Sequence, residues 1–169
     1  PLKGDGSYEA DAGAMAEAVD ASTIMMVGSA PNFPHGIIDP IAALGEVAAA
    51  KGVWLHVDAC VGGYFAPFAR MNGVAVPDFD FAVPAVHSMS ADLHKYGYCA
   101  KGASTVLFRS EALYKHMPFS MKDWSGAPMR TSKPRPMKVS PSGSRACSVS
   151  LTQMPQRMHL PGSKITPPG

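Results

Sequence analysis

Val53-Trp54-Leu55-His56-Val57-Asp58 is a short, mostly apolar stretch that ends on an acidic residue. Apolar runs of this length favour a buried strand over a helix. Gly62-Gly63 follows closely and predicts a turn. Upstream, Asp39 is expected to cap a helix, with Pro40 at its first position. That helix should end at Gly52, because glycine readily adopts the left-handed conformation that closes helices.

Strands and helices continue to alternate on both sides of this stretch. Further strands are expected at residues 23–27, 86–90 and 104–109, helices at 9–20 and 110–117, and irregular chain at 64–84. Such alternation is typical of a parallel sheet with helices packed on its faces. The predicted class is therefore α/β with a mainly parallel sheet. Ligands of such sheets bind beyond the carboxyl ends of the strands, and Asp58 lies at one of these ends.

Charge divides the 169 residues into two unlike parts. Residues 1–126 contain eight Lys/Arg and all 13 Asp/Glu, a net charge of −5. Residues 127–169 contain seven Lys/Arg, no acidic residue and eight of the 16 prolines, a net charge of +7. We therefore predict a globular domain over 1–126 and a disordered basic tail over 127–169. No aromatic residues are interleaved with the charges of the tail, so specific nucleic-acid recognition is not expected.

Membrane-spanning and metal-binding signals are weak. No run of about 18 apolar residues occurs, so no transmembrane helix is expected, although an anchor upstream of Pro1 stays open. The cysteines Cys60, Cys99 and Cys147 are widely spaced and predict neither a metal site nor a disulfide framework. Unpaired cysteines favour a reducing compartment, and the expected location is cytoplasmic or cytosol-facing.

Asp58 and Lys95 form the pair that suggests a chemistry. Lys95 lies in the run Ser90-Ala91-Asp92-Leu93-His94-Lys95-Tyr96-Gly97-Tyr98, downstream of the strand that Asp58 ends. Pyridoxal-phosphate (PLP) chemistry needs a lysine that reacts with the aldehyde, an acid that keeps the pyridine nitrogen protonated, and donors for the phosphate. An aspartate at a strand end and a later loop lysine match the first two needs. Because many chains contain such a pair, the flanking residues must supply the specificity.

The flanking motifs resemble the sphingosine-1-phosphate lyase family, which belongs to the group II PLP-dependent decarboxylases. They are His56 to Gly63, Ser88 to Tyr98 and Lys101-Gly102-Ala103-Ser104, and the loop from Gly28 to Pro40 matches as well. The resemblance covers roughly residues 15 to 126. It implies the aspartate-aminotransferase-like fold (fold type I), with 1–126 as part of the PLP-binding large domain. We therefore expect a piece of a longer enzyme, whose cofactor-phosphate loop lies upstream of Pro1.

The resemblance also implies roles for single residues. Asp58 would pair with the pyridinium nitrogen, and Ala59 would lie against one face of the ring. Lys95 would be the Schiff-base lysine, and His94, directly before it, would contact the cofactor near its phosphate. Lys101 matches a family lysine implicated in handling the phosphorylated substrate.

The implied activity is that of a PLP-dependent carbon–carbon lyase. It would cleave a phosphorylated sphingoid base to a fatty aldehyde and phosphoethanolamine, in a homodimer. An amino-acid decarboxylase of the same group would use the same Asp58 and Lys95. A catalytically dead remnant that acts as an interaction module is a third interpretation. His56 is interpreted as a strand residue with a satisfied hydrogen bond.

Overall fold

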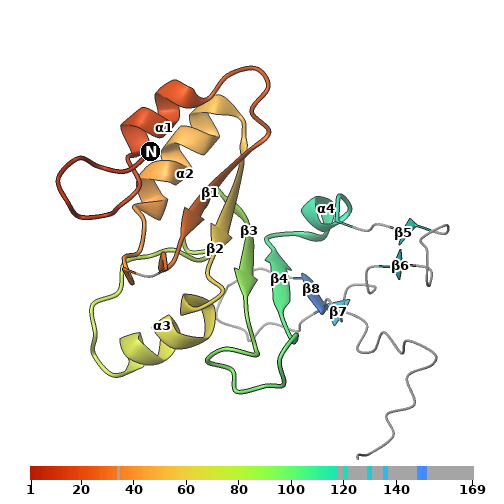
Figure 1. The fold of residues 1–169 in the computed structure, drawn as a ribbon. Helices are drawn as coiled ribbons and strands as arrows, with labels where there is room; N and C mark the ends of the chain where they lie inside the picture. Colours follow the sequence, from red (N-terminus) through yellow and green to blue (C-terminus); the bar gives the residue numbers. More distant parts are fainter. Residues whose placement is uncertain (34, 118–119, 122–128, 131–134, 137–147, 152–169) are drawn as a thin grey trace, which may run out of the picture.

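Three parallel strands form the centre of the fold: β1 (Met25–Ser29), β2 (Trp54–Asp58) and β3 (Val86–Ala91) (Figure 1). This computed structural model describes residues 1–33, 35–117, 120–121, 129–130, 135–136 and 148–151. The fourth strand, β4 (Thr105–Phe108), pairs antiparallel with β3. The connection between them contains no helix, and a parallel neighbour would need a longer crossover. The sheet predicted from the sequence is therefore parallel in its first three strands and antiparallel at β4.

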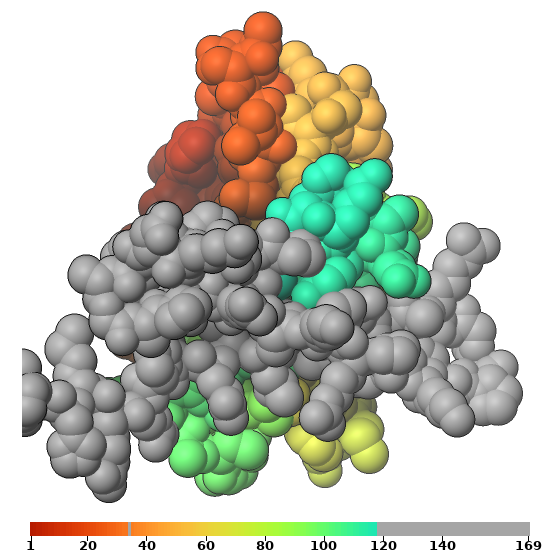
Figure 2. Space-filling model, turned by 90° about the vertical axis from the view of Figure 1, so that its right-hand side faces the viewer, coloured from red at the N-terminus to blue at the C-terminus, as the bar shows by residue number. Residues whose placement is uncertain are grey.

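In the part of the chain that the structure describes, four helices accompany the sheet: α1 (Ala12–Ala18), α2 (Ile41–Lys51), α3 (Gly62–Met71) and α4 (Glu111–Tyr114). Helices α1 and α2 pack side by side on one face of the sheet (Figures 1 and 2). Helix α1 is shorter than predicted, because the side chain of Asp11 caps it by accepting a hydrogen bond from the Ala14 N–H at 3.0 Å. Helix α2 ends as predicted, with Gly52 in the left-handed conformation.

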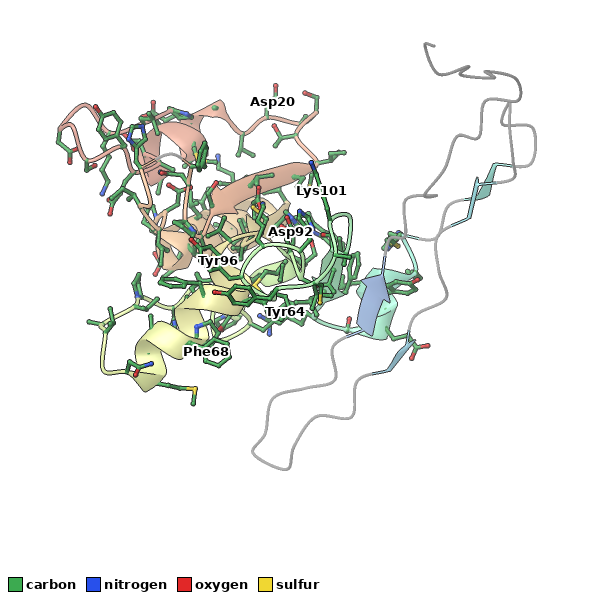
Figure 3. All side chains as sticks on the ribbon, turned by 60° about the horizontal axis from the view of Figure 1, so that its bottom comes forward. Asp20, Tyr64, Phe68, Asp92, Tyr96 and Lys101 are labelled. Carbon is green, nitrogen blue, oxygen red and sulfur yellow. The ribbon has the colours of Figure 1, made fainter. Side chains whose placement is uncertain are left out.

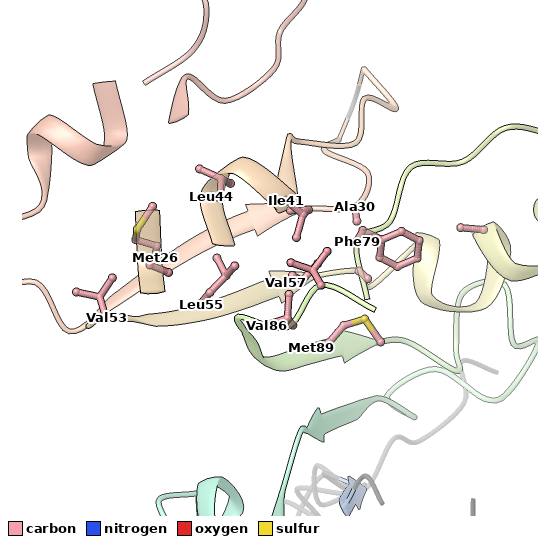
Figure 4. Close-up of a cluster of buried hydrophobic side chains, with 14 residues drawn as sticks. Met26, Ala30, Ile41, Leu44, Val53, Leu55, Val57, Phe79, Val86 and Met89 are labelled. Carbon is pink, nitrogen blue, oxygen red and sulfur yellow. The ribbon is translucent and has the colours of Figure 1, made fainter. Parts of the chain in front are cut away.

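The core lies between β1–β3 and α2, and the neighbouring segments complete it (Figure 4). Leu55 and Val57 of β2 are completely buried, as is Leu44 of α2, while Ile41 and Phe79 are almost so. Burying a side chain of this size contributes about 1.5–3 kcal/mol each. This packing fixes the carboxyl ends of β2 and β3 relative to each other.

Asp39 does not cap helix α2, and that prediction is wrong. Pro40 is the residue that precedes the helix, and no side chain caps it. The carboxylate of Asp39 instead accepts hydrogen bonds from the N–H groups of Ala10, at 3.0 Å, and Ser29, at 2.7 Å. It therefore joins the N-terminal segment to the end of β1.

Gly62 and Gly63 begin helix α3 rather than forming a turn, so residues 64–71, predicted to be irregular, are helical. A Cβ atom at position 62 would lie 2.1 Å from the carbonyl oxygen of Ala30. One at position 63 would lie 2.6 Å from the Cβ of Ala91. The two glycines therefore allow the start of α3 to pack directly against β3 and the loop after β1.

Most of the tail over 127–169 lies outside the described residues, so its predicted disorder stays a prediction. Within the tail the structure describes β6 (Met129–Arg130), β7 (Arg135–Pro136) and β8 (Ser148–Leu151). Strand β8 pairs with β4 and with β7, and β6 pairs with β5 (Ser120–Met121).

Candidate active site

The carboxyl ends of β2 and β3 place Asp58 opposite Ser90. The Ser90 hydroxyl and the Cys60 N–H both donate hydrogen bonds to Oδ1 of Asp58, at 3.0 and 3.1 Å. Burial acts to raise the pKa of Asp58, but these bonds, the Cys60 thiol and His56 together lower it below the usual 3.8. Asp58 is therefore a carboxylate at neutral pH.

Lys95 lies in a tight loop that begins where β3 ends. Its N–H donates to the carbonyl of Asp92 at 3.3 Å, and its carbonyl accepts from the N–H of Tyr98 at 3.2 Å. A Cβ atom at Gly97 would lie 2.6 Å from the carbonyl oxygen of Leu93, so this loop requires a glycine there. The loop thus holds Lys95 close to the sheet edge.

The Lys95 amine is paired with an acid that the sequence motifs did not single out. Nζ of Lys95 lies 2.9 Å from Oδ2 of Asp92. Burial acts to lower the pKa of Lys95, but Asp92 and the Cys60 thiol raise it above the usual 10.5. The Cys60 N–H donates to Asp58 at 3.1 Å, and the Cys60 carbonyl accepts from the N–H of Asp92 at 3.1 Å, so Cys60 joins the predicted acid to the residue that pairs with Lys95.

Ala59 does not face this edge. It is completely buried in the core cluster, whereas Cys60 is partly exposed. Burial raises the pKa of the Cys60 thiol, which therefore stays protonated at neutral pH. Cys60 rather than Ala59 is therefore the partly exposed side chain that follows Asp58, and the predicted ring contact of Ala59 stays a prediction.

His94 has a defined ring tautomer. Its backbone N–H and its ring Nδ1 both lie within hydrogen-bonding distance of the Ala103 carbonyl, at 2.9 and 2.7 Å. Because a carbonyl only accepts, Nδ1 carries the hydrogen. Nε2 lies 3.7 Å from Oδ2 of Asp92, on the side of Lys95.

Lys101 lies in the turn that leads to β4, and it is exposed. Figure 3 shows Asp92, Tyr96 and Lys101 on the chain between β3 and β4, with Tyr64 and Phe68 on the neighbouring helix α3. Among the residues that the structure describes, no hydrogen bond or ion pair engages the Lys101 amine. The structure therefore leaves this amine available but does not join it to Asp58.

A polar network lies along the same face of the sheet, toward the middle of the strands. The Trp54 indole N–H donates to the Ser88 hydroxyl at 2.8 Å, and that hydroxyl lies 2.7 Å from Nδ1 of His56. The indole can only donate, so the Ser88 oxygen accepts from Trp54, and Ser88 and His56 share the second hydrogen bond. Burial lowers the pKa of His56, which is therefore neutral and satisfied, as predicted.

Three polar residues of the site escaped prediction: Ser90, Asp92 and Cys60. A signal for them was present, because Ser88 and Ser90 alternate with apolar residues along β3 and so share one face of the sheet. That face is also the face of Asp58, through the register of β2 with β3.

Neither a metal centre nor a membrane span is seen in the described part of the chain. No three His, Cys, Asp or Glu side chains there are grouped to hold a metal ion. None of its helices is long and apolar enough to cross a membrane.

Comparison with known proteins gives consistent matches. Residues 7–122 match the family described as the pyridoxal-dependent decarboxylase conserved domain. Over 122 residues the chain is 50% identical to sphingosine-1-phosphate lyase of Arabidopsis thaliana, covering 72% of this chain and 22% of that one. Over 120 residues it is 48% identical to sphingosine-1-phosphate lyase of Dictyostelium discoideum, covering 71% and 23%. The chain thus spans about a fifth of the length of the curated relatives it matches.

Solved structures agree with these matches. Sphingosine-1-phosphate lyase of Burkholderia pseudomallei superposes with a TM-score of 0.65 at 48% identity, covering 73% of this chain and 28% of that one. Mouse CSAD, at a TM-score of 0.54 and 22% identity, covers 68% of this chain and 24% of its own and shares the fold. The resemblance and the α/β fold class predicted from the sequence are confirmed.

Proposed function

Because the chain belongs to the pyridoxal-dependent decarboxylase family, we propose that it carries the lysine and ring-acid portion of a PLP-dependent carbon–carbon lyase. Its substrate would be a phosphorylated sphingoid base, cleaved to a fatty aldehyde and phosphoethanolamine. The relatives named sphingosine-1-phosphate lyase, 41–50% identical, support this substrate class. The observation that carries the proposal is the chain of contacts from Asp58 through the backbone of Cys60 to Asp92, whose carboxylate lies 2.9 Å from the Lys95 amine.

The side chains present fit PLP. Bound PLP supplies an aldehyde for a lysine amine and a ring that withdraws electrons from the substrate. Asp58, charged and only partly buried, would keep the ring nitrogen protonated. Lys95, whose side chain is 35% exposed, would bind the aldehyde, and Cys60 would border the ring. His94 would face the cofactor through Nε2.

Lys101 would bind the phosphate of the substrate. Its amine is exposed, and no acid in the described part of the chain pairs with it. A lysine ammonium is a suitable point charge for a phosphate group. A lysine that binds the substrate phosphate would favour a phosphorylated sphingoid base over an ordinary amino acid as the substrate.

A homodimer, in the cytoplasm or facing the cytosol, is part of the same proposal. Helix α3 leaves Phe65, Phe68 and Met71 exposed, and apolar surface of this kind is often covered by a partner subunit. Light scattering of the purified chain measures its mass directly. A monomer at every concentration would remove the homodimer from the proposal for this chain.

The test of the proposal is a PLP absorbance titration followed by borohydride reduction. A visible imine band is expected on adding PLP, and reduction should fix the cofactor on Lys95. Lys95→Ala should abolish the band, whereas the matched control Lys101→Ala should keep it. Reduced cofactor on another lysine would contradict the assignment of Lys95, and the absence of any band would favour the inactive remnant.

The substrate class is tested on the same preparation. Incubation with a phosphorylated sphingoid base should release a fatty aldehyde and phosphoethanolamine. Lys101→Ala should mainly weaken substrate binding, so that a higher substrate concentration is needed for the half-maximal rate. Carbon dioxide release from amino acids, with no aldehyde from the sphingoid base, would identify the amino-acid decarboxylase instead.

A further inference from the structure

Asp92 is a buried acid whose charge is compensated by the reactive lysine itself. Its side chain is 12% exposed, and burying a carboxylate is costly unless hydrogen bonds and opposite charges compensate it. Oδ1 accepts a hydrogen bond from the Ser104 hydroxyl, and Oδ2 lies 2.9 Å from Nζ of Lys95. The compensating cation is therefore the amine that the proposed reaction would use.

The position of Asp92 does not depend on Lys95 alone. Its backbone N–H donates to the carbonyl of Cys60 at 3.1 Å, which ties it to the segment after β2. The Ser104 hydroxyl ties its carboxylate to the start of β4. Asp92 thus joins three segments of the sheet edge, and its carboxylate is held in place before any ligand arrives.

We propose that Asp92 is the positioning residue of the reactive lysine: it holds the Lys95 amine as an ammonium beside Cys60 until an aldehyde ligand takes its place. The inference rests on the proposed function for the identity of that aldehyde. Asp92 itself touches neither the cofactor nor the substrate in this role. It acts through Lys95, by fixing where the amine lies and how readily it loses a proton.

Release from Asp92 must precede bond formation, because only the neutral amine has a lone pair. Because the Lys95 side chain is 35% exposed, the ammonium first gives one proton to the solvent. The lone pair of Lys95 then attacks the aldehyde carbon. The aldehyde oxygen leaves as water with the two remaining amine hydrogens, as the carbon–nitrogen double bond forms.

Two groups that face Lys95 govern the pH dependence of this amine. Asp92, on the same loop, and the Cys60 thiol, after β2, face Lys95 and favour its charged form, against the effect of burial. Removing the charge of Asp92 should therefore make Lys95 reactive at lower pH. Because a nearby opposite charge favours the charged form of an amine, its removal should raise the fraction of neutral amine by a factor of about 10.

The experiment is amine-selective labelling of the full chain without PLP, from about pH 8 to pH 11, with the rate at each lysine read by peptide mass spectrometry. The wild-type labelling midpoint of Lys95 is expected above 10.5. Asp92→Asn should label Lys95 about tenfold faster at a fixed pH below the midpoint, and Asp92→Glu should stay closer to wild type. Asp5→Asn, which removes the charge of an exposed aspartate in the N-terminal segment, is the matched control, and Lys101 is the internal reference.

The results separate this proposal from the proposed function. An unchanged Lys95 midpoint in Asp92→Asn, or an equal acceleration at Lys101, would overturn the role of Asp92. If Asp92→Asn does not fold, the wild-type midpoint decides, and a value at or below 10.5 overturns the role. If Asp92→Asn accelerates the labelling of Lys95 but borohydride fixes PLP on another lysine, only the proposed function is contradicted. Trapping on Lys95 without an Asp92 effect would contradict only the present inference.

Discussion

Substitutions of Asp39 test whether its buried carboxylate caps helix α2 or joins two other segments of the chain. As a helix cap it would stabilise only the start of α2. In the structure it instead accepts hydrogen bonds from the N–H groups of Ala10 and Ser29, which belong to separate segments. Serine caps helices about as well as aspartate, but its single hydroxyl cannot reach both N–H groups. The variants Asp39→Ala and Asp39→Ser therefore give different results under the two explanations.

The magnitude follows from the two hydrogen bonds. A buried N–H that loses its acceptor costs about 1–3 kcal/mol, so Asp39→Ala should lower the free energy of unfolding by about 3 kcal/mol. Loss of a helix cap costs only about 1 kcal/mol. Asp39→Ser should lower the free energy of unfolding by about 2 kcal/mol, because at least one N–H stays unpaired. If Asp39 were only a helix cap, the same substitution would leave the free energy of unfolding nearly unchanged.

Urea unfolding followed by circular dichroism measures these differences. With a slope of about 2 kcal/mol/M, the midpoint should fall by about 1.5 M for Asp39→Ala and about 1 M for Asp39→Ser. Asp11, which does cap a helix, supplies the matched control: Asp11→Ser should leave the midpoint nearly unchanged. A midpoint of Asp39→Ser equal to wild type would refute the structural account of Asp39.

Two further predictions concern the packing and the pH dependence of the domain. Gly63→Ala should lower the free energy of unfolding by about 1–3 kcal/mol in the same urea assay, because its Cβ would lie 2.6 Å from that of Ala91. Gly4→Ala, with nothing within 4 Å, should have little effect, and equal losses would contradict the packing argument. Burial lowers the folded-state pKa of His56 below 6.5, so the unfolded chain takes up the proton first and stability should fall as pH decreases below 6.5. His56→Gln should flatten this decline, whereas the control His35→Gln, at an exposed histidine, should not. Parallel pH profiles of stability for His56→Gln and wild type would refute the assignment of the decline to His56.

Local sequence signals predicted the elements whose formation depends on local chemistry. Helix α2 ends where Gly52 adopts the left-handed conformation, and β2 is the apolar run that ends on Asp58. The start of α3 was missed because glycine has two uses. It usually marks a turn, but Gly62 and Gly63 are required by contacts with Ala30 and Ala91, which are distant in sequence. Only the packed structure distinguishes these uses.

Asp39 shows the same limit for polar residues. Aspartate before proline at a helix start is a common cap pattern, and nothing nearby in sequence indicates a different partner. The decisive partners are Ala10, 29 residues upstream, and Ser29 at the end of β1. A buried carboxylate forms as many hydrogen bonds as tertiary structure offers, and two partners outweigh one cap.

Side-chain alternation along β2 supports the proposal that Cys60, rather than Ala59, would border the cofactor ring. Leu55, Val57 and Ala59 are completely buried, so the odd-numbered side chains of this segment face the core. Successive strand residues point to opposite faces, which places Asp58 on the other face and extends the pattern to Cys60 just after the strand. The N–H of Cys60 also donates to Asp58 at 3.1 Å, which holds the two residues together. One register therefore accounts for both the packing of the core and the grouping of the reactive side chains.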